Sequence, residues 1–326
     1  NKDYEAALAK FGEALSISTV MNDKSSMAKT YNSMAILNFR TDDKDNALKN
    51  WLHALAIVEE FGDKPKISKY LNNIGIWYWK DDDYSKSIEY YQKSLLIKRE
   101  LGDVRNIAKT LNNLGEVYFA MGDYTNSTKQ FDESIEIKEK LKDDKGLNTA
   151  LYNRGETYFY SFEYNRAIDD FRRTIKMIDD EESDHERYRY IGMSHFYLSN
   201  FDSCNFYLKK SDEFFANDYR KRLSILPYLV ISYMKTGDNT LSNTALKNFR
   251  DIIADNDPPD KDYIITNWAA YKALSAVNEK SEAAEYLENA YFMLKSKSKD
   301  IKNKQDRKKY LSAKLHENIT NEWSKR

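Results

Sequence analysis

The sequence predicts an all-α fold in which helix pairs stack one after another into a right-handed superhelix of about seven pairs. The main observation is a fixed period of forty residues. A Leu-Asn-Asn-Ile-Gly segment at residues 71–75 returns at 111–115 and, in altered form, at 31–35 and 151–155. Such a period is typical of a solenoid, because one helix pair cannot bury its apolar face alone. A second marker follows each polar turn, at Tyr4, Lys44, Tyr84, Tyr124 and Tyr164.

Each unit is expected to contain two helices joined by a polar turn. In the unit that starts near residue 65, the apolar positions are 71, 74, 75 and 78 before the turn and 84, 88, 91 and 95 after it. Spacings of three and four residues place each set on one face of a helix. Glycine stands at position 75 and again at 115 and 155, with Ala35 at the same place. Since glycine costs a helix interior roughly 1 kcal/mol relative to alanine, its recurrence indicates that the two helices approach closely there.

Two units carry a longer pattern of a large residue, Gly, Tyr, a small residue, an aromatic residue and a second small residue. It occurs at 111, 115, 118, 127, 131 and 134, and again at 151, 155, 158, 167, 171 and 174. This pattern resembles the tetratricopeptide repeat in its long forty-residue form, which occurs in kinesin light chains, spindle adaptors and bacterial signalling proteins. The resemblance weakens beyond residue 180. Three degenerate units are expected there, at Gly192 with Cys204, Gly237 with Ala245, and Ala283 with Ala290.

Two regions are therefore expected. Residues 1–295 form the repeat solenoid, with about four regular repeats to residue 180 and then about three degenerate ones. Residues 296–326 form a basic C-terminal capping helix. Between residues 295 and 326, eleven Lys and Arg stand against four Asp and Glu, and Tyr310, Leu315 and Ile319 recur at helical spacing. This composition is typical of a terminal helix with one apolar and one solvated basic face, and a patch for nucleic acid or membrane is the alternative.

The first residues match only the second helix of a unit. Residue 1 is Asn rather than Met, and Tyr4, Ala7, Phe11 and Ala14 fall on one helical face. We therefore expect the chain to be a piece of a longer protein, with the first helix of that unit upstream. An uncapped helix leaves its apolar face open, which predicts fraying or self-association there.

Motifs for catalysis, metals and nucleotide cofactors are absent from the sequence: it contains no His-Glu-x-x-His, Walker A loop, Gly-x-Gly-x-x-Gly or Cys-x-x-Cys. We therefore expect no enzymatic activity, no cofactor and no bound metal.

His195 replaces a packing Tyr and Cys204 a small residue, so both are expected in the core. The acidic runs at 81–83 and 179–182 lack the alternating ligands of a calcium loop and are expected to be solvated turns. A single cysteine and the lack of a signal peptide or long apolar run favour a cytoplasmic location.

The first helix of each unit carries a second stripe of residues opposite its packing face. At about 100° per residue, Lys69, Asn73 and Lys80 lie on the side away from Leu71 and Tyr78. When the pairs stack, the first helices line the inner wall of the superhelix, so these stripes join into one groove. An amide offers both a donor and an acceptor, which suits the backbone of an extended peptide. The predicted peptide-binding residues are Asn73, Asn113 and Asn153, with Lys29, Lys69, Lys109, Arg40 and Lys80.

The resemblance implies the same role, because in long tetratricopeptide arrays the second Asn of such a segment contacts the backbone of bound peptides. Lysines favour an acidic partner, while Glu116 and Glu156 reverse the charge further along the groove. We expect a non-enzymatic protein- or peptide-binding scaffold or sensor within a larger signalling protein. Lysines that only solubilise the helix, and amides that only bond the neighbouring unit, are the alternatives. Two other functions stay open: a nucleic-acid-binding solenoid that uses the basic tail, and a regulatory subunit of a catalytic domain outside this chain.

Overall fold

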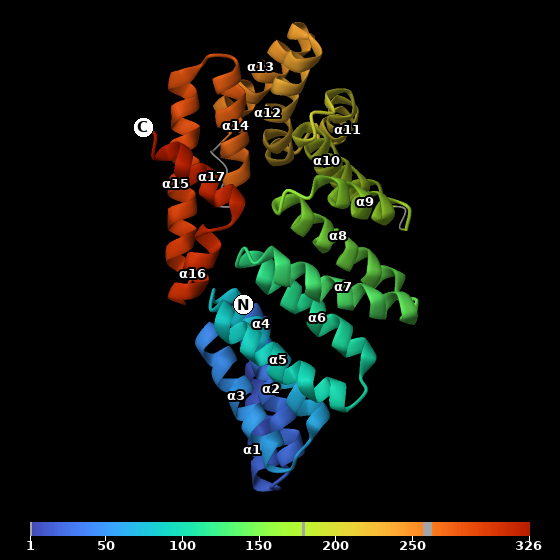
Figure 1. Ribbon diagram of the computed structural model, residues 1–326. Coiled ribbons are helices and arrows are strands. Elements are labelled where there is room, and N and C mark those ends of the chain that lie inside the picture. Colours follow the sequence, from blue (N-terminus) through green and yellow to red (C-terminus); the bar gives the residue numbers. More distant parts are fainter. Residues whose placement is uncertain (1, 178–179, 257–262) are drawn as a thin grey trace.

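The computed structural model describes residues 2–177, 180–256 and 263–326. Within these ranges the chain forms seventeen α-helices and no strand (Figure 1). In chain order they are α1 (Lys2–Val20), α2 (Lys24–Arg40), α3 (Lys44–Glu60), α4 (Lys64–Lys80), α5 (Tyr84–Glu100), α6 (Val104–Ala120), α7 (Tyr124–Leu141), α8 (Asp144–Tyr160), α9 (Tyr164–Ile175), α10 (Glu181–Tyr197), α11 (Phe201–Phe214), α12 (Tyr219–Thr236), α13 (Asn239–Asp255), α14 (Ile264–Ala276), α15 (Lys280–Asp300), α16 (Lys304–Leu311) and α17 (Lys314–Trp323).

Helices α2 to α15 form consecutive pairs in which an even-numbered first helix precedes an odd-numbered second helix. In the described part of the chain these are seven pairs, and each pair packs against the next. Figure 1 shows them stacked in chain order, from blue to orange. The prediction of an all-α solenoid of about seven helix pairs is confirmed.

An aspartate N-cap begins every helix from α2 to α8, at intervals of twenty residues. The carboxylate of Asp63, for example, accepts a hydrogen bond from the backbone N–H of Lys66 at 3.1 Å. The preceding residue, Gly62, has a positive φ, which reverses the chain sharply between two helices. Such a cap stabilises a helix by about 1 kcal/mol. One helix with its capped turn is therefore half of the forty-residue repeat.

The repeated glycine lies where the two helices of a pair cross. A Cβ atom on Gly115 would lie 2.6 Å from Cε1 of Phe131, and one on Gly75 would lie 2.8 Å from Cδ1 of Tyr91. The close approach predicted from the sequence is confirmed, because no side chain fits between these helices. The hydroxyl of Ser127 uses the same gap and donates to the carbonyl oxygen of Gly115 at 2.9 Å. Ser127 thus satisfies its hydroxyl at the position where other repeats of this chain have Ala47 and Ala167.

The later pairs keep this packing although the sequence period slips. Helix α9 ends at Ile175 after only twelve residues, and α10 begins at Glu181. Cys204 is fully buried, and the buried ring of His195 stacks 5.7 Å from that of Tyr207. Both residues lie in the core as predicted. Burial lowers the pKa of His195 and raises the pKa of the Cys204 thiol to about 12.

The C-terminal helices α15 to α17 return to the turns that follow α4 and α6, where Figure 1 shows α16 beside the cyan and green helices. The backbone N–H and the hydroxyl of Ser85 both donate to the carboxylate of Asp306 at 2.8 Å. Tyr310 and Leu315 join Tyr84 in one buried apolar cluster. We call this contact the closure. Its ion pairs are Lys297 with Asp82, Lys302 with Asp81, and Lys309 with Asp123.

The closure corrects two predictions. The acidic run at 81–83 is not a solvated turn, because two of its aspartates pair with lysines and the third caps α5. The basic tail is not a single helix with a solvated basic face: residue 296 lies within α15, and Ser312 separates α16 from α17. Its apolar side is as predicted, since Tyr310 and Ile319 are buried. The second acidic run includes residue 179, which lies outside the described residues.

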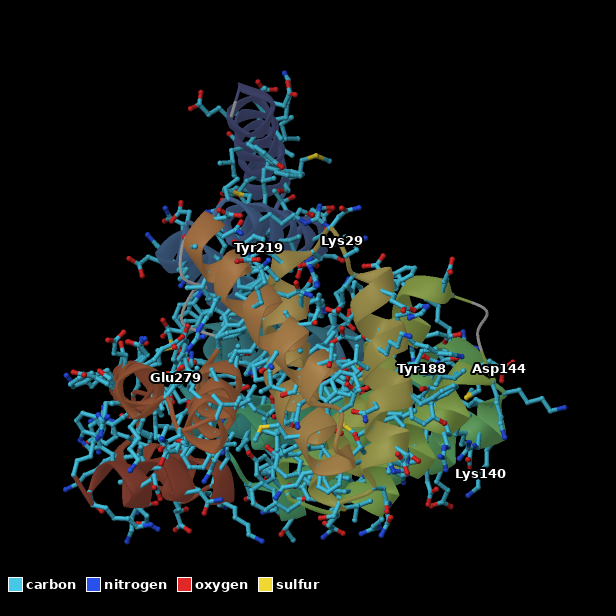
Figure 2. The ribbon with its side chains drawn as sticks, turned by 90° about the horizontal axis from the view of Figure 1, so that it is seen from above. Lys29, Lys140, Asp144, Tyr188, Tyr219 and Glu279 are labelled. Atoms are coloured by element: carbon cyan, nitrogen blue, oxygen red, sulfur yellow. The ribbon has the colours of Figure 1, made fainter. Side chains whose placement is uncertain are left out.

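Helix α1 packs mainly against α2 and projects from the rest of the molecule (Figure 2). It exposes Tyr4 and Ile17, and self-association through it stays a prediction. None of the helices in the described ranges has an apolar stretch of the length that a bilayer requires. The same ranges contain no cluster of His, Cys, Asp and Glu side chains that could hold a metal ion.

Candidate functional site

Four of the eight predicted residues line one cleft along the first helices. Lys69 and Asn73 of α4 and Lys109 and Asn113 of α6 border a cavity of about 670 Å³, which we call the α4–α6 cleft. All four belong to the stripe that helical spacing places opposite the packing face. The start of α8 forms the far edge of the cleft through Thr149. The helical wheel therefore locates a real concavity in this part of the chain.

The other four predicted residues lie elsewhere. Lys29 and Arg40 are exposed on α2, and Figure 2 shows Lys29 near the base of the projecting α1. Lys80 lies at the C-terminal end of α4, where its ammonium group is 4.5 Å from the centroid of the Trp79 ring. Asn153 lies on α8 beyond the cleft. The structure thus places four of the eight predicted residues in one cleft and the other four outside it.

Two of the groove asparagines bridge neighbouring first helices. Nδ2 of Asn73 donates to Oδ1 of Asn32 on α2 at 3.1 Å, and Nδ2 of Asn153 donates to Oε1 of Glu116 on α6 at 3.0 Å. The alternative in which these amides bond the neighbouring unit is therefore present in the structure. Each bond uses part of the capacity of an amide, which has two N–H donors and a carbonyl acceptor. Bridging fixes the orientation of these side chains and leaves further groups for a ligand.

Two buried lysines form the floor of the α4–α6 cleft. Lys98 of α5 is 6% exposed and Lys138 of α7 is 4% exposed, although both line the cleft. Nζ of Lys98 donates to Oγ1 of Thr110 at 2.6 Å and to Oδ1 of Asn72 at 3.2 Å. Among the described residues, no carboxylate forms an ion pair with either ammonium group. Burial lowers the pKa of both lysines, to about 8 for Lys98.

The sequence prediction does not include these lysines, because it assigns the second helices only to packing. Their place in the repeat is nevertheless informative. Forty residues before Lys98, the same position holds Val58, which is fully buried in α3. Lysine at a core position in two successive repeats is a signal for a polar site, since burying an ammonium group is costly. A comparison of the core positions of successive repeats would detect this polar site from the sequence.

Glu116 and Glu156, predicted to reverse the charge of the groove, are held within its wall. Burial raises the pKa of Glu116, which accepts hydrogen bonds from Nδ2 of Asn112 at 2.8 Å and of Asn153. Burial also raises the pKa of Glu156 to about 7, and the hydroxyl of Tyr190 donates to it at 2.5 Å. The carboxyl of Glu156 is therefore partly protonated near neutral pH. The reversal of charge is weaker than the sequence suggests.

A second cleft, of about 420 Å³, lies at the opposite ends of the first helices, against the closure. Trp79, Phe119 and Tyr160 contribute aromatic rings from α4, α6 and α8, and Lys80 also lines it. Helices α14 to α17 supply the facing wall. Trp77, by contrast, is buried and donates its indole N–H to a backbone carbonyl of α3. The first helices thus border a polar cleft at one edge and an aromatic cleft at the other.

These features define the class of protein as an α-solenoid of helix pairs with ligand-sized clefts along its first helices. The sequence profile of the tetratricopeptide repeat matches residues 26–100 and 106–180. Residues 26–180 are therefore tetratricopeptide repeats, and they recur with the long forty-residue period. No curated protein matches the sequence significantly.

Solved structures with this fold align over most of the chain. The apo form of RapI has a TM-score of 0.67 at 15% identity, over 83% of this chain and 99% of its own. A Rap protein complexed with Competence and Sporulation Factor has a TM-score of 0.56 at 13% identity, over 92% and 88%. A STAND signal transduction ATPase with a tetratricopeptide repeat sensor, from Pyrococcus horikoshii, has a TM-score of 0.67 at 16% identity, over 88% of this chain and 44% of its own. At these identities the likeness shows the fold alone.

Proposed function

We propose that this chain is a non-enzymatic module that binds an extended, acidic peptide in the α4–α6 cleft. The observation that carries the proposal is the composition of the cleft wall, where amide and ammonium side chains from successive first helices face one cavity. Amides pair with a peptide backbone whatever its sequence, and lysines attract carboxylates. The volume of about 670 Å³ lies within the usual range of ligand sites.

The fold neighbours support a ligand-binding role. A Rap protein of similar fold is known in complex with Competence and Sporulation Factor, and a STAND ATPase carries tetratricopeptide repeats as its sensor. By analogy of fold, the chain serves as the sensor or scaffold part of a larger signalling protein. The alternative of a regulatory subunit describes the same module attached to a catalytic domain and is compatible with peptide sensing.

The nucleic-acid alternative receives less support from the structure. Lys297, Lys302 and Lys309, three lysines of the basic tail, pair with aspartates across the closure. A lysine that is already paired inside the protein releases fewer counterions from a nucleic acid, so it adds less to affinity. We therefore favour a peptide as the ligand.

The test replaces Asn73, Asn113 and Asn153 together by Ala and measures the binding of short acidic peptides by fluorescence anisotropy. We expect about a tenfold or greater loss of affinity, since each hydrogen bond contributes about 0.5–1.5 kcal/mol. The melting temperature should fall slightly, because two of these amides bridge helices. The matched control is Asn165→Ala, on an exposed position of α9. Unchanged affinity in the triple variant contradicts the assignment of the groove.

A further inference from the structure

We infer that Lys98 and Lys138, together with Lys109, form a carboxylate-binding subsite on the floor of the α4–α6 cleft, which holds an acidic side chain of the bound peptide. The subsite is built by three consecutive helices, α5, α6 and α7. The inference rests on the proposed peptide-binding function and names the chemistry that the cleft recognises.

The two floor lysines are buried, and neither ammonium group forms an ion pair with a carboxylate among the described residues. Transfer of an ammonium group out of water costs several kcal/mol unless another charge or a set of hydrogen bonds replaces the lost hydration. Lys98 keeps hydrogen bonds to Thr110 and Asn72. Lys138 makes neither a hydrogen bond nor an ion pair through its ammonium group within the described residues, yet it lines the cleft. An anion in the cleft would supply the missing partner.

The aspartates at the edge of the cleft do not neutralise these lysines. Oδ1 of Asp103 accepts from the backbone N–H of Asn106 at 3.3 Å, and Oδ1 of Asp143 accepts from that of Gly146 at 3.1 Å. These carboxylates therefore serve as the N-caps of α6 and α8. Burial lowers the pKa of the two lysines. Asp103 offsets this effect only in part at Lys98, and Asp143 and Glu116 do so only in part at Lys138. Four lysines against two aspartates leave the lining of the cleft positive.

Lys109 brings a third positive charge to the same place. Its side chain is exposed at the rim of the cleft. After burial, the charge of Lys109 is a further cause of the lowered pKa of both Lys98 and Lys138. Lys98, Lys109 and Lys138 thus bring three positive charges from three helices to the lining of one cleft. One carboxylate placed among them relieves this repulsion and accepts charge-assisted hydrogen bonds.

Packing alone does not require lysine at these positions. Val58 fills the equivalent place in α3 and is fully buried. An apolar side chain therefore fits the repeat, and it costs less there than a buried ammonium group. Core positions of a repeat are normally apolar, and this chain departs from that rule at two positions that line one cleft. Such a departure is typical of a functional site.

The cleft favours a carboxylate carried by a peptide over a phosphate. Its described lining contains no arginine, the side chain whose planar fork recognises phosphate through two hydrogen bonds. The lining does contain Asn72, Asn73 and Asn113, whose amides suit a peptide backbone. Lysine acts as a point charge and accommodates a carboxylate without a fixed geometry.

The test compares pools of octapeptides with blocked termini that differ at one central position, which is Glu, Gln or phosphoserine. The wild-type protein should bind the Glu pool about tenfold more tightly than the Gln pool, the effect expected of a hydrogen bond to a charged group. In the double variant Lys98→Met with Lys138→Met, the Glu and Gln pools should bind alike, with helicity retained. The matched control is Lys129→Met, at an exposed position of α7, which should keep the preference.

The outcomes separate the subsite from the proposed function. Equal binding of the Glu and Gln pools by the wild-type protein, or a preference that persists in the double variant, overturns the subsite and leaves peptide binding intact. A stronger preference for phosphoserine than for Glu overturns the carboxylate assignment. If no pool binds, the proposed peptide function fails. Glutarate alone then decides the subsite by calorimetry: binding to the wild-type protein and not to the double variant supports it, and no binding overturns it.

A second measurement does not depend on any variant. Because the pKa of Lys98 is about 8, part of this side chain is neutral at that pH, and a bound carboxylate should restore its proton. The charged groups that act on Lys98 are Asp103 and Lys109. Calorimetry of the Glu pool in buffers of different ionisation enthalpy should show proton uptake on binding at about pH 8. Binding without uptake overturns the role of Lys98.

Discussion

Single residues of the groove wall show how burial changes charge in opposite directions. Burial lowers the pKa of Lys98 to about 8 and raises that of Glu156 to about 7, so each side chain is closer to neutral than in water. Lys98 faces an open cleft and lacks an anionic partner. Glu156 already receives a hydrogen bond from the hydroxyl of Tyr190. The lysine is therefore a candidate for ligand recognition, whereas the glutamate belongs to the wall.

Replacement of Glu156 by Gln should flatten the pH dependence of stability. The unfolded carboxyl titrates near 4.5 and the folded one near 7, so the folded protein binds more protons between these values and stability falls as the pH rises. Burial is the main cause, and the neighbouring Arg189 and Glu186 act in opposite directions. Above the folded pKa, Glu156→Gln should exceed the wild-type free energy of unfolding by about 1–3 kcal/mol.

Urea unfolding at about pH 5 and about pH 8 measures this difference for the wild-type protein and Glu156→Gln. The control is Glu288→Gln, at an exposed position of α15, which should keep the wild-type slope. A Glu156→Gln variant that also keeps this slope would show that the Glu156 carboxyl is fully ionised in the fold.

At the scale of the helices, the two helices of a pair cross so closely at the repeated glycine that little side-chain volume is tolerated there. Gly115→Ala should destabilise the protein by about 1–3 kcal/mol, although alanine gains about 1 kcal/mol in helix propensity. The new Cβ would lie 2.6 Å from the buried ring of Phe131. Phe131→Leu should restore part of this loss in the double variant. Thermal unfolding measures both effects, with Gly12→Ala as the control, because nothing lies within 4 Å of a Cβ there. A higher melting temperature for Gly115→Ala would refute the crowded crossing.

The helix pairs are predictable from the sequence because their determinants are periodic. Leu111 and Gly115 define a packing face that recurs with the same step, so local spacing suffices. The same wheel places Lys69 and Asn73 in the cleft. The helical wheel does not reveal Lys98. Only a comparison of the core positions of several repeats shows that a lysine stands at a buried position there.

The closure could not be predicted from the sequence, because its contacts have no periodic signal. Ser85 and Asp306 are separated by 221 residues, and a hydrogen bond between them depends on the curvature summed over several pairs. The acidic turns and the basic tail are each visible as charge runs. Charge alone does not show that two such segments contact each other, because each charged segment is also stable when water surrounds it.

For the whole molecule, the closure departs from the usual behaviour of a solenoid, in which each unit contacts only its neighbours. Helices α15 to α17 contact the second and third pairs of the array through ion pairs, hydrogen bonds and the apolar cluster around Tyr84 and Tyr310. Two distant parts of the array are therefore coupled in stability. The aromatic cleft also depends on the closure, since α14 to α17 form one of its walls.

Loss of the charges in the acidic turns should loosen the closure. The triple variant Asp81→Asn, Asp82→Asn and Asp123→Asn removes its ion pairs while keeping the local geometry, because Asn also caps helices and tolerates a positive φ. The lysines are more than a third exposed, so each pair contributes at most about 1 kcal/mol. Together, their loss should accelerate hydrogen–deuterium exchange of the α16 and α17 amides roughly tenfold.

High salt provides the complementary measurement, because it screens exposed ion pairs and leaves apolar contacts in place. In high salt the wild-type exchange rates of residues 304–323 should approach those of the triple variant, and the variant itself should respond little. Asp45→Asn, at an exposed position of α3, is the control and should behave as wild type. If residues 304–323 stay equally protected in the triple variant, the hydrogen bonds of Asp306 and the apolar cluster hold the closure without help from the ion pairs.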